Sequence, residues 1–268
     1  MERPVLDAMV GIVRRDAQLF ASYRLRLLAQ PFTVLLTLTL FYYVSRLVSV
    51  GRFSEPSSYF AYVVVGLLIV ETLTAALTVT PVAVRNEMLS GTFERLATSP
   101  LGPVRSIVAM CAFPVLLSFG IGTLTIVVAA IVYGLPLAGP QAVLALPVAL
   151  LGALAFLPFA LLTVSAVLAF KQAGAMTSFI VTGLSLASGA FFPVDLLPWW
   201  VRWVSDVQPL TPALELMRET LLDTPVDGGA GLAVVKLVGF SLVLMPVGLW
   251  LLGRTIDRCR RFGTLIEY

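Results

Sequence analysis

The chain has 268 residues, of which 59% are hydrophobic and only 12% are charged, and its mean hydropathy is +0.96. This composition is that of an integral membrane protein and excludes an ordinary soluble domain. The net charge of +3 is therefore interpreted as a topology signal, with no indication of nucleic-acid binding. Histidine is absent and there are two cysteines, so neither a disulfide framework nor a histidine-based metal or hydrolase site is indicated.

Residues 1–27 are expected to form a helix that lies in the membrane interface. Its apolar residues recur at helical spacing, and they are Leu6, Met9, Val10, Val13, Ala17 and Phe20. Charged residues such as Asp7 and Arg14 take other directions around the helix. Two roles stay open for this helix: a membrane anchor and a contact for a cytoplasmic partner.

Six apolar stretches are long enough to cross a bilayer, which takes roughly 20 residues. They lie near residues 28–48, 59–82, 107–133, 143–170, 173–192 and 232–253. The third and fourth stretches are long and contain Pro114, Pro147 and Pro158, so we expect kinks or tilts there rather than straight helices. A charged segment precedes the first stretch, which indicates that there is no cleavable signal peptide.

The basic residues indicate how the chain is oriented. With the N-terminus inside, 13 of the 18 arginines and lysines fall on the cytoplasmic side and 5 on the other. This bias favours a multi-pass protein of the cell membrane with both termini in the cytoplasm, and an even number of spans agrees with it. Residues 193–230 then face outward, and residues 254–268 form a cytoplasmic tail.

The connection 85–105 is expected to carry a short cytoplasmic helix. Residues up to Leu89 extend the second span, Gly91 permits a break, and Thr92 starts a new helix that ends before Pro100. A simple solvated turn is the alternative, but it would leave Phe93 and Leu96 exposed at the inner surface.

The segment 191–222 cannot cross lipid as a regular helix, because it contains acidic residues, two arginines and four prolines. Its tryptophans, Trp199, Trp200 and Trp203, fit the headgroup level of the outer leaflet. We expect Thr211 to cap a short helix that Pro212 opens. Its apolar stripe is predicted to consist of Leu214, Met217 and Leu221, opposite Glu215, Arg218 and Glu219.

Three runs carry a family resemblance: LSGTFERLATSPLGPVRSI after the second span, and GAFFPVDLLPWW and QPLTPALELMRETLL before the sixth. In this order they resemble the membrane subunit of type-2 ABC exporters, and the resemblance covers essentially the whole chain as a single transmembrane domain, residues 1–268. It implies an all-α fold with six spans. It also implies a coupling helix that docks on an ATP-binding subunit, at Gly91, Thr92, Phe93, Glu94, Arg95 and Leu96. An outward re-entrant segment is implied around Pro193, Pro198, Trp199, Pro209, Thr211 and Pro212.

The chain lacks the pattern of a P-loop, because its two lysines, Lys171 and Lys236, follow Phe170 and Val235 rather than a glycine-rich run. It is therefore not expected to hydrolyse ATP or hold a cofactor by itself. The resemblance implies that ATP and Mg²⁺ are bound by a separate partner. Two such ATP-binding subunits would join two permease chains, as a homodimer or with a similar chain.

Glu71 lies near mid-depth in the second span, where an ionised carboxylate is costly. A handle for substrate, an ion-pair latch, a structural hydrogen bond and a protonated acid all stay open. The fifth span is rich in small residues, which favours close helix packing. The resemblance implies that the second and fifth spans face the pathway, which makes candidate lining residues of Leu67, Glu71, Thr74, Thr78, Phe179 and Thr182.

These features favour an exporter permease that moves a hydrophobic or amphipathic molecule, drug-like or lipid, outward by alternating access. Export of a polysaccharide or lipid-linked glycan is the alternative. A secondary carrier is more distant, because no internal repeat surrounds a charged midplane site. An enzyme within the membrane would need clustered carboxylates or a nucleophile with a base, and the sequence shows no such cluster.

Overall fold

A computed structural model describes residues 2–47, 55–99, 101–170, 174–226 and 228–261. All regular secondary structure in these residues is helical, as the sequence predicts. The elements in chain order are α1 (Glu2–Ser22), α2 (Arg24–Leu47), α3 (Pro56–Thr74), η1 (Ala75–Val79), α4 (Thr80–Leu89), α5 (Phe93–Thr98), α6 (Gly102–Tyr133), η2 (Gly139–Leu144), α7 (Ala145–Phe170), α8 (Gly174–Ala187), η3 (Val194–Leu196), α9 (Trp199–Val207), α10 (Leu210–Leu222) and α11 (Ala230–Arg261).

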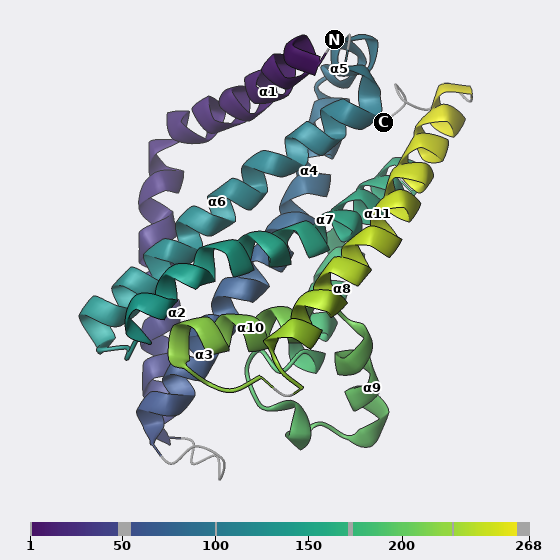
Figure 1. Cartoon of the computed structure of the whole chain (residues 1–268). Helices are drawn as coiled ribbons and strands as arrows, with labels where there is room; N and C mark the ends of the chain where they lie inside the picture. The colour runs from purple at the N-terminus through teal and green to yellow at the C-terminus, as the bar shows by residue number, and fades with distance from the viewer. Residues whose placement is uncertain (1, 48–54, 100, 171–173, 227, 262–268) are drawn as a thin grey trace.

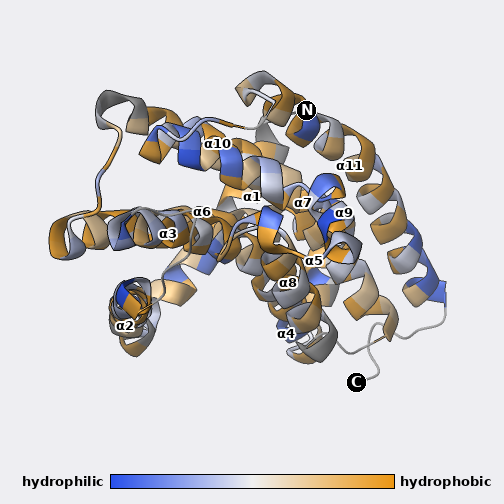
Figure 2. Cartoon of the chain, turned by 90° about the horizontal axis from the view of Figure 1, so that it is seen from below, coloured by the Kyte–Doolittle hydropathy of each residue, from blue (hydrophilic) through white to orange (hydrophobic). Residues whose placement is uncertain are grey.

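The long helices run between two ends of the molecule that differ in character. Figure 1 shows α1, α5 and the last turns of α11 at one end, and α9 and α10 at the other. Seen from the end that carries α9 and α10, hydrophilic residues gather on those two helices, whereas α3 and α11 are largely hydrophobic (Figure 2). The short, charged elements therefore lie at the ends of a mainly apolar bundle.

Four helices in the described part of the chain are long and apolar enough to cross a membrane. They are Pro56–Leu89, Gly102–Tyr133, Ala142–Phe170 and Ala230–Arg261. At about 1.5 Å per residue each exceeds the roughly 30 Å of a bilayer core. These four match the expected second, third, fourth and sixth spans.

The expected first and fifth spans are not among these four helices. The first coincides with α2 as far as Leu47, and Val48 lies outside the described residues. The fifth corresponds to α8, which has 14 residues and ends at Ala187, before a turn that includes Gly189 at a φ of 80°. The count of six spans therefore stays a prediction.

The second expected span is one continuous helix with a wider turn in its middle. Helix α3 passes into η1, a π-helical turn, and then into α4. Pro81 has no N–H to donate and its ring crowds the preceding turn, which accounts for the disturbed hydrogen bonding. The carbonyl of Ala75 accepts the backbone N–H of Thr80, five residues later, and the Thr80 hydroxyl donates to the same carbonyl at 3.3 Å.

Of the three prolines expected to kink the third and fourth spans, two lie in helix interiors. Pro114 is inside α6 and Pro158 is inside α7. Pro147 instead occupies the first turn of α7, where the missing N–H has no intrahelical acceptor to lose. The expected kink at Pro147 was therefore wrong.

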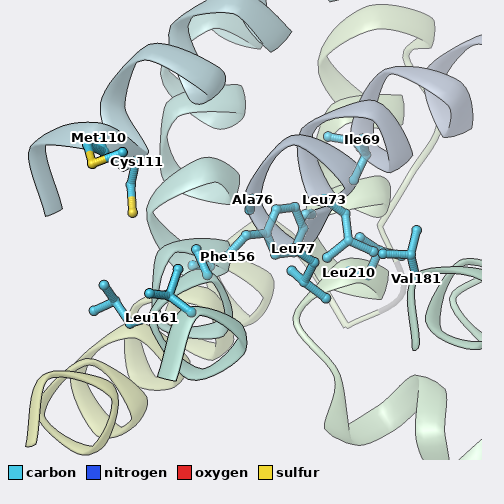
Figure 3. Packing of buried hydrophobic residues seen from close by; sticks show 14 of the residues in the cluster. Ile69, Leu73, Ala76, Leu77, Met110, Cys111, Phe156, Leu161, Val181 and Leu210 are labelled. Atoms are coloured by element: carbon cyan, nitrogen blue, oxygen red, sulfur yellow. The ribbon is translucent and has the colours of Figure 1, made fainter. Parts of the chain in front are cut away.

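The main core lies where α3, η1, α6, α7, α8 and α10 meet. Figure 3 shows Phe156 of α7 beside Leu77 of η1, with Leu210 of α10 and Val181 of α8 close by. Helix α11 packs along α7, where Gly248 allows the two backbones to come close: a Cβ at Gly248 would lie 3.3 Å from the carbonyl oxygen of Pro158. A smaller cluster joins α2, α3 and α6.

Helix α1 forms where the sequence predicts a helix, and it packs on α6 and α2. Ile12 is buried, and the ring of Phe20 lies 5.9 Å from that of Phe113. Leu6, Val10 and Leu19 are exposed. Exposed apolar side chains on a helix at one end of the bundle fit a position in the membrane interface, which stays a prediction.

Candidate functional site

The expected coupling helix is present as α5, and a glycine turn separates it from α4. Gly91 has a φ of 70°, which an L-residue with a side chain rarely adopts, and its N–H donates to the carbonyl of Met88 at 3.1 Å. This is a left-handed helix C-terminus of the usual kind. It turns the chain sharply enough for α5 to begin at Phe93.

Phe93 anchors α5 in the bundle. Its side chain is 2% exposed and belongs to the main core, while Leu96 packs against that core and is partly buried. The carbonyl of Leu96 accepts hydrogen bonds from Ser99 Oγ at 2.7 Å and from Ser106 Oγ of α6 at 3.5 Å. The alternative of a simple solvated turn, with Phe93 and Leu96 exposed, is therefore wrong. Arg95 is exposed, and the side chain of Glu94 lies outside the described part of the structure.

Thr92 occupies the expected position before α5 but makes a different contact. Its hydroxyl makes no capping bond to the helix and instead donates to the Glu87 carboxylate. It also lies 2.8 Å from the Ser90 hydroxyl. The helix therefore starts where the sequence predicts, with Thr92 directly before it, and the Thr92 hydroxyl contacts a carboxylate of the preceding helix.

Glu87 links three elements at this end of the molecule. One of its oxygens accepts from Thr92 before α5, and the other lies 2.9 Å from Nη2 of Arg15 on α1. Arg15 also pairs with Asp16 at 2.8 Å. Burial raises the pKa of Asp16, although its hydrogen bond with Arg15 acts in the opposite direction. The sequence interpretation placed Arg15 among the charged residues of the interfacial helix and the cytoplasmic topology determinants, and it missed Glu87, because no local pattern relates residues so far apart in the chain.

The four candidate pathway residues of the second span share one side of α3 and η1. Leu67, Glu71, Thr74 and Thr78 follow at helical spacing, and all four are partly exposed. Thr74 Oγ1 donates to the carbonyl of Val70 at 2.8 Å. On α8, which contacts α3 and η1, Phe179 is 79% exposed and Thr182 is exposed as well. Of these six side chains, the four on α3 and η1 are therefore partly exposed and the two on α8 are exposed; their role in a pathway stays a prediction.

Glu71 is partly buried and makes neither a hydrogen bond nor an ion pair with another residue that the structure describes. An ion-pair latch or a structural hydrogen bond within this part of the chain is therefore not seen. Its remaining expected roles involve something outside the single chain or a protonated carboxyl.

The segment expected to be re-entrant is built from short helices that begin after prolines. Pro193, Pro198 and Pro209 occupy the positions just before η3, α9 and α10. Proline suits this place because its fixed φ leads into a helix and its missing N–H costs no bond there. On α9 all three tryptophans, Trp199 among them, are exposed.

Two expectations for α10 were wrong. The helix begins at Leu210 after Pro209, so Thr211 lies inside it and does not cap it, and Pro212 lies within the first turn. Leu214, Met217 and Leu221 are buried as expected. Arg218, expected on the polar side, is only 7% exposed.

Arg218 holds the turn after α8. Its Nη2 donates to the carbonyls of Gly189 at 2.9 Å, Ala190 at 3.3 Å and Tyr62 at 3.3 Å. Its guanidinium carbon lies 3.4 Å from the centre of the Tyr62 ring, and the Tyr62 hydroxyl donates to Gly189 at 2.7 Å. Burial lowers the pKa of Arg218 to about 10, against the effect of Tyr62 and Glu215, so the side chain stays protonated at neutral pH.

The fold and these sites define an all-helical membrane protein with a short helix fixed at one end of the bundle and a folded, charged segment at the other. Comparison with protein families gives its membership. The family model for the ABC-2 type transporter matches residues 9–222, which is most of the chain, and the chain belongs to this family. A comparison with curated proteins gave no match. The chain is therefore a transmembrane subunit of an ABC transporter, a permease rather than the ATPase.

Proposed function

We propose that this chain is the permease subunit of an ATP-driven exporter that moves hydrophobic or amphipathic molecules outward by alternating access. Family membership supplies the transporter class and implies an ABC ATP-binding subunit as partner. The proposed assembly contains two permease chains and two ATP-binding subunits, which carry ATP and Mg²⁺. It resides in the cell membrane with the α5 end in the cytoplasm.

The observation that carries the proposal is the way α5 is fixed. Phe93 is inserted into the core, and Glu87 joins the approach to α5 with α1 through Arg15. A helix held by packing and by hydrogen bonds moves with the bundle when it is pushed. The exposed Arg95 of α5 and the exposed Gly91 of the turn before it are left for the ATP-binding subunit.

The proposed pathway runs along the exposed side chains of α3, η1 and α8 and is completed by the second permease chain. Its lining mixes apolar groups such as Leu67 and Phe179 with the hydroxyls of Thr74 and Thr182. Such a mixed surface suits a hydrophobic or amphipathic substrate.

The test is to purify the tagged chain in mild detergent from cells that also produce its ATP-binding subunit, and to measure bound ATPase and ATP-dependent efflux. Arg95→Glu is expected to reduce both several-fold while the amount of membrane-inserted chain is unchanged. Asp206→Arg, a charge change of equal size on the exposed side of α9, is the matched control and should leave both at wild-type level. Wild-type ATPase association in Arg95→Glu would contradict docking on α5, and ATP-independent transport would contradict the exporter.

A further inference from the structure

A cavity of about 610 Å³ lies at the end of the molecule that carries α10. It is bounded by the first turns of α3, the connection after α6, the turn after α8 and one side of α10. Small-molecule sites usually measure about 300–1,000 Å³, so the cavity has the size of a ligand site. It is separate from α5 and from the proposed pathway residues, none of which lines it.

Helix α10 presents a polar stripe to this cavity. Thr211, Glu215 and Arg218 follow one another at spacings of four and three residues, and Leu222 completes the same side. The residue that sequence analysis expected to be solvated, Arg218, is 7% exposed, and its Nε has no hydrogen-bond partner among the described residues. The same holds for Oγ1 of Thr211. Two donors in the wall thus lack acceptors, which is unusual for buried polar groups.

The charges of the wall define what would fit. Arg218 contributes one positive charge, while Glu215 and Asp195 contribute two carboxylates. A purely anionic ligand would be attracted by Arg218 but repelled by the two carboxylates, and a purely cationic ligand would be attracted by the carboxylates but repelled by Arg218. A group with an acid and an amine a few bonds apart meets both requirements. Leu137, Val194 and Leu222 add an apolar part to the wall.

We propose that this cavity binds the zwitterionic phosphate–amine headgroup of an amphipathic molecule, with the phosphate on the side of Arg218 and Thr211 and the ammonium on the side of Glu215 and Asp195. The apolar part of the wall receives the first atoms of the hydrophobic portion. The same headgroup chemistry is available from a membrane lipid or from a soluble phosphodiester.

The experiment uses the full chain in nonionic detergent and calorimetric titration with glycerophosphoethanolamine. The comparison probes are glycerol 3-phosphate, which is only anionic, and ethanolamine, which is only cationic. The zwitterion is expected to bind at least about tenfold more tightly than either, because each charged contact contributes on the order of a tenfold change in affinity. Equal binding of glycerol 3-phosphate and the zwitterion would overturn the proposal, and so would no binding of the zwitterion.

Variants on α10 assign the binding to the cavity. Glu215→Gln and Thr211→Val should each weaken glycerophosphoethanolamine binding about five- to tenfold. Glu219→Gln is the matched control, because Glu219 is on the same helix but does not line the cavity. This variant should bind glycerophosphoethanolamine as tightly as the natural chain. Arg218 is left intact because it holds the turn after α8. Equal affinity in Glu215→Gln and Glu219→Gln would overturn the assignment.

Titration in nanodiscs distinguishes the two sources of the headgroup. If the site is filled from the bilayer, phosphatidylethanolamine discs should compete with the soluble probe and phosphatidylglycerol discs should not. Equal binding of the probe in both would identify a soluble ligand. All these measurements use the chain without its ATP-binding subunit, so failure here is distinguishable from failure of the proposed exporter function.

Discussion

Arg218 lies where the chain reverses direction after α8, and its contacts replace hydrogen bonds that a longer helix would have made. The last carbonyls of a helix lack intrahelical donors, and a cation at this end is favoured by the helix dipole. Gly189 and Ala190 lie just beyond the end of α8 at Ala187, and Arg218 donates to the carbonyls of both while Tyr62 covers the guanidinium. One side chain from α10 therefore fixes the end of α8 against α3.

The same turn explains a close contact at Gly66 of α3. A Cβ at this position would lie 2.0 Å from the carbonyl oxygen of Ala190, which is held by Arg218 and cannot move freely. Gly66→Ala is therefore expected to destabilise the protein by about 1–3 kcal/mol, as overpacking usually does. Thermal unfolding of the detergent-purified chain measures this. Gly120→Ala on α6, where nothing lies within 4 Å of the new Cβ, should show no loss, and equal melting temperatures of the two variants would contradict the close contact.

Glu71 presents a second residue-scale question, since its carboxyl has no polar partner among the described residues of the chain. If it contacts cargo or the second permease chain, Glu71→Gln should keep more transport than Glu71→Leu, because the amide keeps most hydrogen bonds. The difference should be about tenfold or more, the size of one hydrogen bond to a charged group. Transport and dimer yield are measured together, because packing affects both and cargo contact affects transport alone. A tolerated Leu with a harmful Gln would mean that Glu71 has no polar role.

Individual polar side chains were the hardest to predict from the sequence. The helical pattern of α10 correctly predicts that Leu214 and Met217 are buried, but it places the buried Arg218 on the solvated side. Arg218 donates to backbone carbonyls of residues far away in the sequence, and no residue type in the sequence indicates that these carbonyls are its acceptors. Thr211 was misjudged for a local reason, since Pro209 allowed the helix to start earlier.

At the scale of elements, α1, α4 and α5 form one connected unit through Arg15, Glu87 and Thr92. The pair of Arg15 and Glu87 is partly buried, with side-chain exposures of 36% and 16%. Immediately beyond α4 lies the π-helical turn η1 near Pro81, where the regular hydrogen bonding of the helix is interrupted. We expect a firm end joined to a weaker turn to concentrate bending at η1, which contains the candidate pathway residue Thr78.

This arrangement predicts that Arg15 and Glu87 act together. Arg15→Ala and Glu87→Ala should each lower substrate-stimulated ATPase activity several-fold, and the double variant should be no worse than the worse single one. A partly exposed ion pair contributes about 1 kcal/mol, or roughly fivefold. The measurement is a double-mutant cycle on the reconstituted complex. Strictly additive losses would show that the two residues act independently.

The elements themselves were largely predictable, because the length of an apolar run determines whether a helix spans a bilayer. The helix α3–η1–α4, with its extension to Leu89, and the short α5 are where the sequence put them. The extent of α8 was not, since the small residues after Ala187 continue the apolar run while the chain turns at Gly189. The wider turn η1 also escaped prediction, because Pro81 indicates a disturbance but not its form.

For the whole molecule, the elements that the sequence assigns to opposite sides of the membrane lie at opposite ends of the bundle, while the orientation itself stays a prediction. Helices α1 and α5 and the last turns of α11 share one end, and the proposed headgroup cavity, α9 and α10 share the other (Figure 1). If the ATP-binding subunit docks on α5, the cavity and the exposed tryptophans of α9 face outward. Tryptophans at that end suit the headgroup region of the outer leaflet.

Cysteine labelling tests this orientation directly. Asp206 on α9 and Thr98 on α5 are both exposed, at opposite ends of the bundle. The native cysteines, Cys111 and Cys259, are buried, so the natural chain is a low-background control. A membrane-impermeant maleimide added to intact cells should label Asp206→Cys and leave Thr98→Cys unlabelled until the membrane is permeabilised. Asp227, which the sequence also places on the outward side, lies outside the described residues. Labelling of Thr98→Cys in intact cells would invert the orientation and separate α5 from a cytoplasmic ATPase, so this one result decides whether the coupling proposal stands.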